Sequence, residues 1–268
     1  MVYQQGGPAV LIDAHCHLDF SEFDQDRGAV FAAAHTAGVS HFIVPGTTRK
    51  RWQQVLALGE RSDVSVCLGL HPYFMEQHQR DEDILALEQA LYSNPQVAAV
   101  GECGIDARFT DSWESQWRLF DDQLRLAKQY KLPVVVHCVQ ANDKVSKRLR
   151  QLALPQAGLI HAFSGSIEQA QKFLDVGFVL GIGGGVTYER AQRLRRTVAA
   201  LPNDGFVLET DSPDMPLSGH QGERNEPQCV AHVCRVVATL RNQTEEEVAA
   251  HSSANAARLF KLQAFQDS

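Results

Sequence analysis

Short apolar runs alternate with longer amphipathic stretches along most of the chain. Eight such runs can be recognised: Ala9–Ala14, Phe42–Pro45, Val64–Leu70, Val97–Gly101, Pro133–Val136, Gly158–Ile160, Phe178–Gly181 and Phe206–Leu208. Between them, apolar residues recur every three or four positions, the spacing of a helix with one buried face. These helical stretches are Asp26–Ala37, Arg49–Arg61, Asp81–Tyr92, Trp113–Tyr130, Asp143–Leu152 and Ile167–Val176. The alternation predicts repeated β–α units, with a parallel sheet that is covered by helices.

Either a closed eight-stranded barrel or an open, doubly wound sheet satisfies this pattern. The chain has 268 residues, and a (β/α)8 barrel typically takes about 250 residues for one domain. Because no internal repeat, low-complexity tract or linker-like segment interrupts the chain, residues 1–268 are expected to form a single domain. Two further segments, Pro227–Leu240 and Thr244–Phe260, have helical spacing and are expected to wrap the outside of the barrel.

Composition excludes several classes of protein. With 44% hydrophobic and 21% charged residues, the chain can bury a full core, which excludes disorder as its main state. Its 25 Lys and Arg against 32 Asp and Glu give a net charge of −7, so no global positive field attracts nucleic acid or anionic lipid. A nucleic-acid substrate would therefore need a local basic patch.

Targeting and cysteine patterns point to the location of the protein. No apolar run approaches the roughly 20 residues that cross a bilayer, and Met1–Gly7 lacks the basic start and apolar core of a secretory leader. The six cysteines include no CxxC pair, and their scatter predicts free thiols. These features predict a cytoplasmic protein with neither a membrane segment nor an obligate protein partner.

Residues with metal-binding side chains follow the ends of several apolar runs. They are His15 and His17 after the first run, His71 after the third, Glu102 after the fourth, His137 after the fifth, His161 after the sixth and Asp211 after the eighth. In a parallel barrel the carboxyl ends of all strands meet at one rim, so residues far apart in the sequence come together there. We therefore predict one site at this rim.

Strand geometry indicates which donors face that site. Side chains alternate in direction along a strand, so His15 and His17 point the same way while Cys16 points away. The same alternation removes the sulfur atoms of Cys103 and Cys138 from the site. Nitrogen and oxygen donors remain, and such a set suits Zn²⁺, Mn²⁺ or Mg²⁺.

The order of strands in a barrel predicts two centres. The first and eighth strands are neighbours, which brings together His15, His17 and Asp211. His137 and His161 come from the adjacent fifth and sixth strands, with Glu102 beside them. Because a carboxylate has two oxygens, Glu102 could bridge two ions roughly 3.5–4 Å apart, a spacing at which paired ions clamp the attacking and leaving oxygens of a hydrolysis.

His71 and Asp106 each allow two interpretations. A single histidine at a strand end, such as His71, is as consistent with a structural or supporting role as with metal binding. Asp106 follows Glu102 by four residues and is either a partner that holds a ligand imidazole or an acid of a turn. The remaining histidines lie in helical or loop contexts and are expected to be surface or packing residues: His35, His41, His78, His220, His232 and His251.

Eight short motifs run through nearly the whole chain. They are I-D-A-H-C-H-L at Ile12–Leu18, G-L-H-P at Gly69–Pro72, G-E-C-G-I-D at Gly101–Asp106, P-V-V-V-H at Pro133–His137, H-A-F-S-G at His161–Gly165, E-T-D-S-P at Glu209–Pro213, R-N-E-P at Arg224–Pro227 and A-N-A-A-R-L-F at Ala254–Phe260. In this order and spacing they resemble the TatD family of metal-dependent hydrolases and deoxyribonucleases, in particular its YjjV-like branch.

The resemblance implies a single TIM barrel of the amidohydrolase type that binds two divalent cations. It implies that His15, His17, Glu102 and Asp211 bind one ion, and that Glu102, His137 and His161 bind the other. Family members described as deoxyribonucleases trim DNA, so the implied substrate is DNA or a small phosphodiester. Our leading hypothesis is hydrolysis by water that is activated at this pair of ions, with Glu102 and Asp211 as catalytic carboxylates and Asp211 helping to receive the proton.

Two positions depart from the family pattern. Tyr73 stands where many relatives have a second His after G-x-H-P, and Val139 stands where the motif usually continues as His-x-Arg. If that Arg contacts a phosphate, Val139 removes a charge-assisted contact, which weakens the case for a nuclease. Substitutes for it are Arg108, Lys144 and Arg224. The basic stretches Arg190–Arg196 and Lys147–Arg150 are more simply interpreted as solvated helix faces.

Two alternatives to a nuclease remain. The same metals could hydrolyse a small amide, lactone or other ester, because the loops of a barrel accommodate such changes of substrate. A centre with a carboxylated lysine is disfavoured because Glu102, not a lysine, ends the fourth strand. The second alternative is a non-catalytic metal-binding protein, against which the complete ligand set argues.

Overall fold

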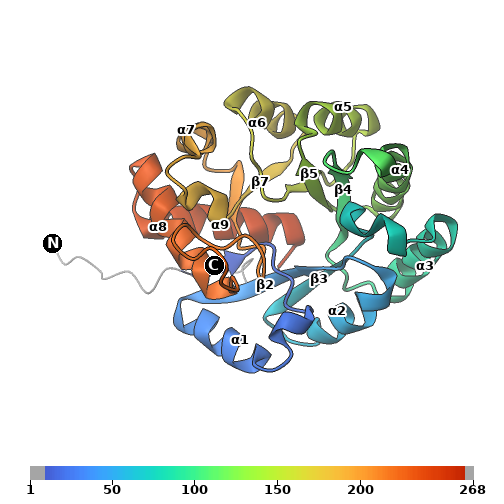
Figure 1. The fold of residues 1–268 in the computed structure, drawn as a ribbon, viewed down its shortest axis with the longest axis horizontal. Helices are drawn as coiled ribbons and strands as arrows, with labels where there is room; N and C mark the ends of the chain where they lie inside the picture. Colours follow the sequence, from blue (N-terminus) through green and yellow to red (C-terminus); the bar gives the residue numbers. More distant parts are fainter. Residues whose placement is uncertain (1–9, 263–268) are drawn as a thin grey trace.

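The eight strands form one parallel sheet in which each strand pairs with the next along the chain (Figure 1). The structure is a computed structural model that describes residues 10–262. The strands are β1 (Leu11–Asp13), β2 (Val39–Pro45), β3 (Val64–Leu68), β4 (Ala99–Asp106), β5 (Val134–Val139), β6 (Gly158–Ile160), β7 (Val179–Ile182) and β8 (Phe206–Leu208). This order excludes the doubly wound alternative, in which the strand order reverses within the sheet. Hydrogen bonds from Ala14 N to Leu208 O (3.0 Å) and from Asp211 N to His15 O (2.9 Å) join the first and last strands. The predicted barrel is confirmed.

Helices follow the strands and surround the barrel (Figure 1). They are α1 (Arg27–Thr36), α2 (Trp52–Leu58), α3 (Arg80–Ser93), α4 (Trp113–Tyr130), α5 (Asn142–Leu152), α6 (Ile167–Leu174), α7 (Gln192–Ala200), α8 (Val230–Arg241) and α9 (Glu245–Phe260). Short 3-10 helices occur in the connections, at Ser21–Phe23, Arg49–Arg51, Pro72–Gln77, Thr110–Ser112, Gly184–Thr187 and Pro227–Cys229. Within residues 10–262, no helix is long and apolar enough to cross a membrane. The leader predicted to be absent at Met1–Gly7 lies outside the described residues.

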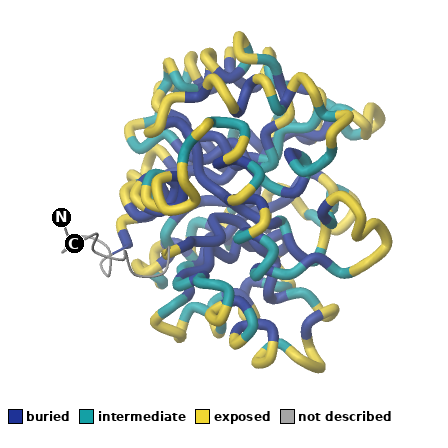
Figure 2. Tube along the Cα trace, turned by 90° about the vertical axis from the view of Figure 1, so that its left-hand side faces the viewer, coloured by how far each residue is buried: buried dark blue, intermediate teal, exposed yellow. Residues whose placement is uncertain are grey.

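Alternation along the strands builds two layers of core. Side chains such as Ile12, Ile43 and Val135 form one cluster that fills the barrel. Their neighbours in the same strands, such as Phe42 and Val134, belong to a larger cluster between the sheet and the helices. Figure 2 shows the result, with a buried centre and exposed residues on the outer turns. The interior is packed, so ligands can approach only at the ends of the barrel.

The two C-terminal helices occupy different places, which corrects the expectation that both wrap the outside. Helix α8 packs in the outer layer through Val233 and Val237. Helix α9 instead contributes Phe260 to the cluster inside the barrel. Asn255 on α9 donates hydrogen bonds to the carbonyl of Phe206, the first residue of β8, and to that of Asn203, both at 2.8 Å. Helix α9 therefore covers the amino end of the barrel and leaves the carboxyl end for the site.

Two strands extend beyond their predicted ends. Strand β4 continues through Glu102 to Asp106, and β5 continues through His137 to Val139. The apolar pattern stops earlier because the last residues of these strands carry polar side chains while their backbones still pair. Glu102 and His137 therefore lie within the hydrogen-bonded sheet, where they are held more rigidly than residues of a loop.

Candidate metal centre

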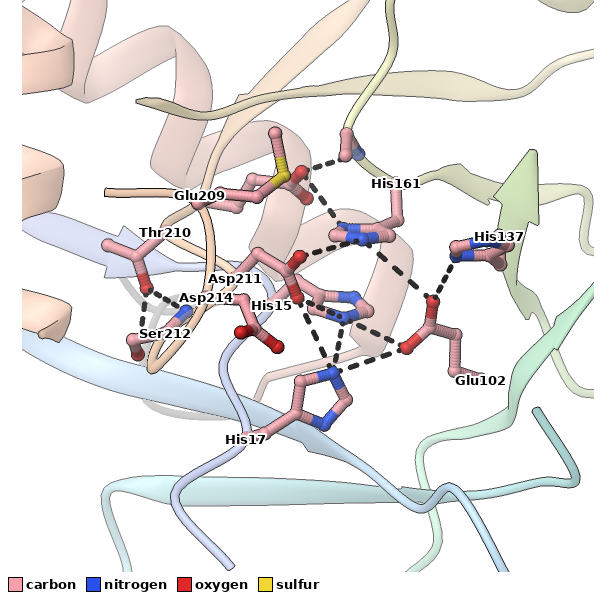
Figure 3. Close-up of polar contacts among 12 residues, drawn as sticks. His15, His17, Glu102, His137, His161, Glu209, Thr210, Asp211, Ser212 and Asp214 are labelled. Atoms are coloured by element: carbon pink, nitrogen blue, oxygen red, sulfur yellow. Dashed lines mark hydrogen bonds and ion pairs between the residues drawn. The ribbon is translucent and has the colours of Figure 1, made fainter. Parts of the chain in front are cut away.

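Four side chains converge at the carboxyl end of the barrel (Figure 3). Nε2 of His15 lies 3.2 Å from Nε2 of His17 and 3.2 Å from Oε2 of Glu102. Nε2 of His17 lies 3.3 Å from the same Oε2, and Oδ1 of Asp211 lies 3.4 Å from each Nε2. Tetrahedral ligands that lie about 2.0 Å from Zn²⁺ are roughly 3.3 Å apart, which matches the spacing of the two histidines from each other and from each carboxylate oxygen. The spacing of these four donors fits a divalent cation.

A buried carboxylate ties together the two segments that carry this group. Asp13, at the end of β1, accepts hydrogen bonds from Thr210 N (2.9 Å) and Thr210 Oγ1 (2.6 Å). Thr210 immediately precedes Asp211, and Asp13 lies two residues before His15. Sequence analysis did not identify Asp13, because a single acid in a strand gives no signal of a partner about two hundred positions away.

The other oxygen of Glu102 faces a second group of imidazoles. Oε1 lies 2.9 Å from Nε2 of His71, 3.1 Å from Nδ1 of His137 and 3.8 Å from Nε2 of His161. His161 is nearer to Asp211, whose Oδ2 lies 3.5 Å from its Nε2. Sequence analysis expected His137 and His161 beside Glu102, but the structure places His71 there as well. Glu102 presents one oxygen to each group of donors.

The hydrogen bonds of His71 define its chemistry. Its Nδ1 accepts a hydrogen bond from the backbone N–H of Tyr73 (2.9 Å), so the proton of the neutral ring is on Nε2. Burial lowers the pKa of His71 to about 4, so the ring is neutral near pH 7. A protonated Nε2 has no lone pair for a metal. The geometry thus favours a hydrogen-bond donor over a metal ligand at His71.

His137 has the opposite arrangement. Its Nε2 lies 3.0 Å from Oδ2 of Asp106, which accepts the ring proton. Arg108 fixes that carboxylate with two hydrogen bonds of its own, Nε to Oδ1 (2.9 Å) and Nη2 to Oδ2 (2.6 Å). The Nδ1 lone pair of a neutral His137 then points at Glu102 Oε1, and the two repel unless a proton or a metal cation lies between them. Of the two interpretations of Asp106, the structure matches a partner that holds an imidazole, here that of His137.

Glu209 is a buried acid that sequence analysis missed. Its Oε1 lies 3.0 Å from Nδ1 of His161 and accepts a hydrogen bond from the backbone N–H of Ala162 (2.6 Å). A side chain at position 181 would overlap this carboxylate, so Gly181 on β7 provides its space. The signal available was the E-T-D sequence, in which Glu209 and Asp211 stand two apart. Glu209 orients His161 with Nε2 toward the site.

The surroundings of the centre keep Glu102 ionised and favour positive charge beside it. Burial opposes ionisation of Glu102, but the adjacent His71, His15 and His161 outweigh it and hold its pKa well below the usual value. Burial likewise disfavours a charged His17, yet its contacts with Asp211 and Glu102 raise the pKa of His17 to about 10. Glu102 Oε2 is buried and makes no hydrogen bond within the described chain. Two ionised carboxylates with inward-facing nitrogens therefore fit a bound metal.

These groups lie in a cavity of about 580 Å³ at the mouth of the barrel. Its wall includes Phe20, Tyr73, Phe74, Arg108 and Met215. The structure does not bring Arg224 to this cavity, which corrects its expected substrate contact. The guanidinium of Arg224 instead donates to Asp26 at 2.7 and 2.9 Å and to Glu226 at 2.7 Å, because these acids lie beside it outside the mouth.

The cysteines take no part in either group of donors, as predicted. All six are free thiols. Cys16 Sγ and Cys103 Sγ each lie 3.6 Å from a backbone carbonyl, of Ile43 and Val135 respectively. Cys138 lines the cavity, but its Sγ donates to Asn142 Oδ1 at 3.2 Å, and burial raises the pKa of its thiol to about 12. Nitrogen and oxygen donors alone face the centre.

Comparison with known proteins agrees with this chemistry. Residues 12–261 match the family model described as "TatD related DNase". The chain is 42% identical over 255 residues to the uncharacterised metal-dependent hydrolase YjjV of Escherichia coli K12, covering 94% of this chain and 98% of the relative. It is 34% identical over 264 residues to a protein of Erwinia tasmaniensis named 3'-5' ssDNA/RNA exonuclease TatD, covering 94% and 100% of the two chains.

Solved structures show the same fold. The crystal structure of E. coli YjjV superposes with a TM-score of 0.91 at 42% identity and covers 95% of this chain and 99% of that one. An organophosphorus hydrolase of Deinococcus radiodurans shares the barrel at 14% identity, with a TM-score of 0.64 and coverage of 94% and 92%. The motifs, the barrel and the convergent donors lead to one assignment: this chain belongs to the TatD family of metal-dependent hydrolases.

Proposed function

We propose that this protein hydrolyses phosphodiester bonds near an end of single-stranded nucleic acid, with two divalent cations bound on either side of Glu102. The observation that carries the proposal is the position of Glu102, whose two oxygens face two separate sets of donors. A relative at 34% identity is named 3'-5' ssDNA/RNA exonuclease, which supports the choice of substrate.

The donors divide naturally between two ions. His15, His17, Glu102 Oε2 and Asp211 Oδ1 would hold one ion, and Glu102 Oε1, His137 and His161 would hold the other. Bound together, divalent cations would lower the pKa of a water molecule and neutralise charge on a phosphate. The donor set accepts Zn²⁺, Mn²⁺ or Mg²⁺.

Two side chains of the centre hold or accept a proton. The Asp211 side chain is 15% exposed and lies at the cavity surface, so its Oδ2 can take up the proton that water loses on attack. His71 keeps Nε2–H pointed at Glu102 Oε1, 2.9 Å away, and this contact holds the carboxylate in place at the floor of the same cavity. Its neutral state near pH 7 makes that donor permanent over the physiological range.

The mouth of the cavity favours a nucleotide over a small amide or lactone. Tyr73 and Phe109 are 58% and 39% exposed, and their rings lie edge to face with centroids 5.4 Å apart. Tyr73 lines the cavity above His71. Exposed aromatic rings beside a site for phosphate provide a surface on which a base can stack. Tyr73, which departs from the family pattern, therefore adds a surface for the substrate. The donors around Glu102 at the base of the cavity are still present.

Replacing Tyr73 by Ala tests this surface. Because stacking on an aromatic ring is worth about 1–3 kcal/mol per base, Tyr73→Ala should raise KM for a single-stranded oligonucleotide roughly 5- to 150-fold. Tyr92→Ala is the matched control, because Tyr92 is a 75% exposed tyrosine on α3. An unchanged KM in Tyr73→Ala would show that the ring does not contact the substrate.

The proposed function itself is tested by offering two classes of substrate. Protein loaded with Mn²⁺, Mg²⁺ or Zn²⁺ is incubated with labelled single-stranded oligonucleotides and, separately, with a panel of small amides and lactones. We expect progressive shortening of the oligonucleotide from one end, abolished by chelator. Turnover confined to the amide and lactone panel would reject the nuclease and establish the alternative hydrolase.

A further inference from the structure

A second hollow adjoins the metal cavity and is not needed to hold the metal. We call it the side groove; its volume is about 680 Å³ and it is lined by Trp113, Asn142, Lys144, Gln169 and Arg193, among others. It shares Cys138, Val139, Ala162 and Ser164 with the metal cavity. Because these shared residues end β5 or follow β6, the groove runs from the metal cavity toward α5 and α7.

Two cations border the side groove without an acidic partner. Lys144 on α5 and Arg193 on α7 are both exposed, and neither forms an ion pair within residues 10–262. Some other exposed arginines do contact acids: Arg61 lies 2.8 Å from Asp63, and Arg80 lies 2.6 Å from Asp122.

Stability of the fold does not explain these two cations. Each lies in the first turn of its helix, where the positive end of the helix dipole disfavours a positive charge. The nearby acid Asp143 is already bound to Lys172 (2.8 Å) and to Gln169 (3.2 Å), so it does not neutralise them. An anion in the groove would compensate both charges.

Trp113 holds one of these charges in place. The Lys144 ammonium lies 4.6 Å from the centroid of the Trp113 ring, a cation–π contact that fixes the charge above the groove. Val139, which stands where relatives carry an arginine, lies in the wall between the two hollows. The positive charge missing at position 139 is thus supplied by Lys144, five residues later, which lines the side groove but not the metal cavity.

We propose that the side groove binds the sugar–phosphate chain of a single-stranded nucleic acid next to the bond that is cut, with Lys144 and Arg193 as its phosphate contacts. The proposal rests on the nuclease function proposed above and adds the path of the strand, over α5 and α7. Bases must be unpaired for one strand to bend from this groove into the metal cavity. These two positions form the local basic patch that a protein of net negative charge needs.

The test compares two double variants of equal charge. Lys144→Gln with Arg193→Gln removes both groove cations, and Lys147→Gln with Arg196→Gln removes two exposed cations of the same helices that do not line the groove. Binding of a fluorescein-labelled 12-nucleotide single strand is measured by anisotropy from 50 to 200 mM salt, with the metal-free protein. Hydrolysis of the same strand and of a small diester, bis(p-nitrophenyl) phosphate, is measured with the metal-loaded enzyme.

We expect the groove variant to bind the strand on the order of tenfold more weakly at 50 mM salt, with a slope of log K against log salt that is smaller by about 1.4. Its KM for the strand should rise while hydrolysis of the small diester stays unchanged. The control variant should match the unaltered protein. Equal affinity and salt slope in both variants, or no binding of the strand by the unaltered protein, would overturn the proposal that the side groove binds the strand. If the strand binds in a way that depends on the groove but is not hydrolysed, the result would instead reject the proposed nuclease function.

Discussion

Replacing Glu102 by Gln is expected to lower hydrolysis by about 10²- to 10³-fold, the range seen when one electrostatic contact to the reacting group is lost. The change keeps the size of the side chain but removes its charge and one acceptor oxygen. Because Glu102 presents one oxygen to each group of donors, its loss affects both proposed ions. Turnover and metal content per chain are measured together, after loading with the same metal.

Exposed Glu114→Gln on α4 is the matched control, since its 85% exposed carboxylate contacts only Arg118, at 3.7 Å. It should leave both turnover and metal content unchanged. Glu102→Gln should keep the fold, as judged by circular dichroism, because the position stays filled. A Glu102→Gln protein that still binds two ions and turns over at the normal rate would contradict the proposed role of this residue.

Replacing Gly104 by Ala is expected to cost the fold about 4 kcal/mol or more, an exceptional loss for a single methyl group. Gly104 pairs with His137 in the β4–β5 ladder and has a φ of 146°, which side chains rarely adopt. A Cβ at this position would overlap the carbonyl oxygen of His137. The two strands would have to separate exactly where they carry Glu102 and His137, so metal binding should weaken as well.

Urea unfolding of metal-free protein measures this cost, with Gly28→Ala as the control. Gly28 lies in α1, and a Cβ added there meets nothing within 4 Å. Because alanine is the better helix former, Gly28→Ala should be neutral or stabilise the protein by up to about 1 kcal/mol. An unfolding midpoint for Gly104→Ala close to that of the unaltered protein would show that β4 and β5 can accommodate a side chain here.

The barrel and the set of converging residues could be predicted because both depend on a repeating pattern. Apolar runs mark the strands, and in a parallel barrel each run ends at the same rim, so the residues that follow it share one place. His15, His17, Glu102, His137, His161 and Asp211 were found by that rule alone. The structure brings them within reach of one another, as the distances around Glu102 show.

Other features depend on contacts that no pattern in the sequence encodes. Glu209 and Asp13 act through partners on other strands; Asp13 lies inside an apolar run, and Glu209 comes directly after one. The protonated nitrogen of His71 is set by the backbone N–H of Tyr73, which only coordinates reveal. Arg224 lies in a motif, yet nearby Asp26 holds it outside the cavity. Helix α9 has the same amphipathic spacing as an outer helix, and its place across the amino end of the barrel depends on contacts such as those of Asn255 with Asn203 and Phe206.

The most direct test of the account is anomalous X-ray diffraction from crystals grown with Mn²⁺ or Zn²⁺. We predict two anomalous peaks on either side of the Glu102 carboxylate, one near His15, His17 and Asp211 and the other near His137 and His161. A single peak, or peaks that lie away from Glu102, would contradict a centre of two ions joined by this residue.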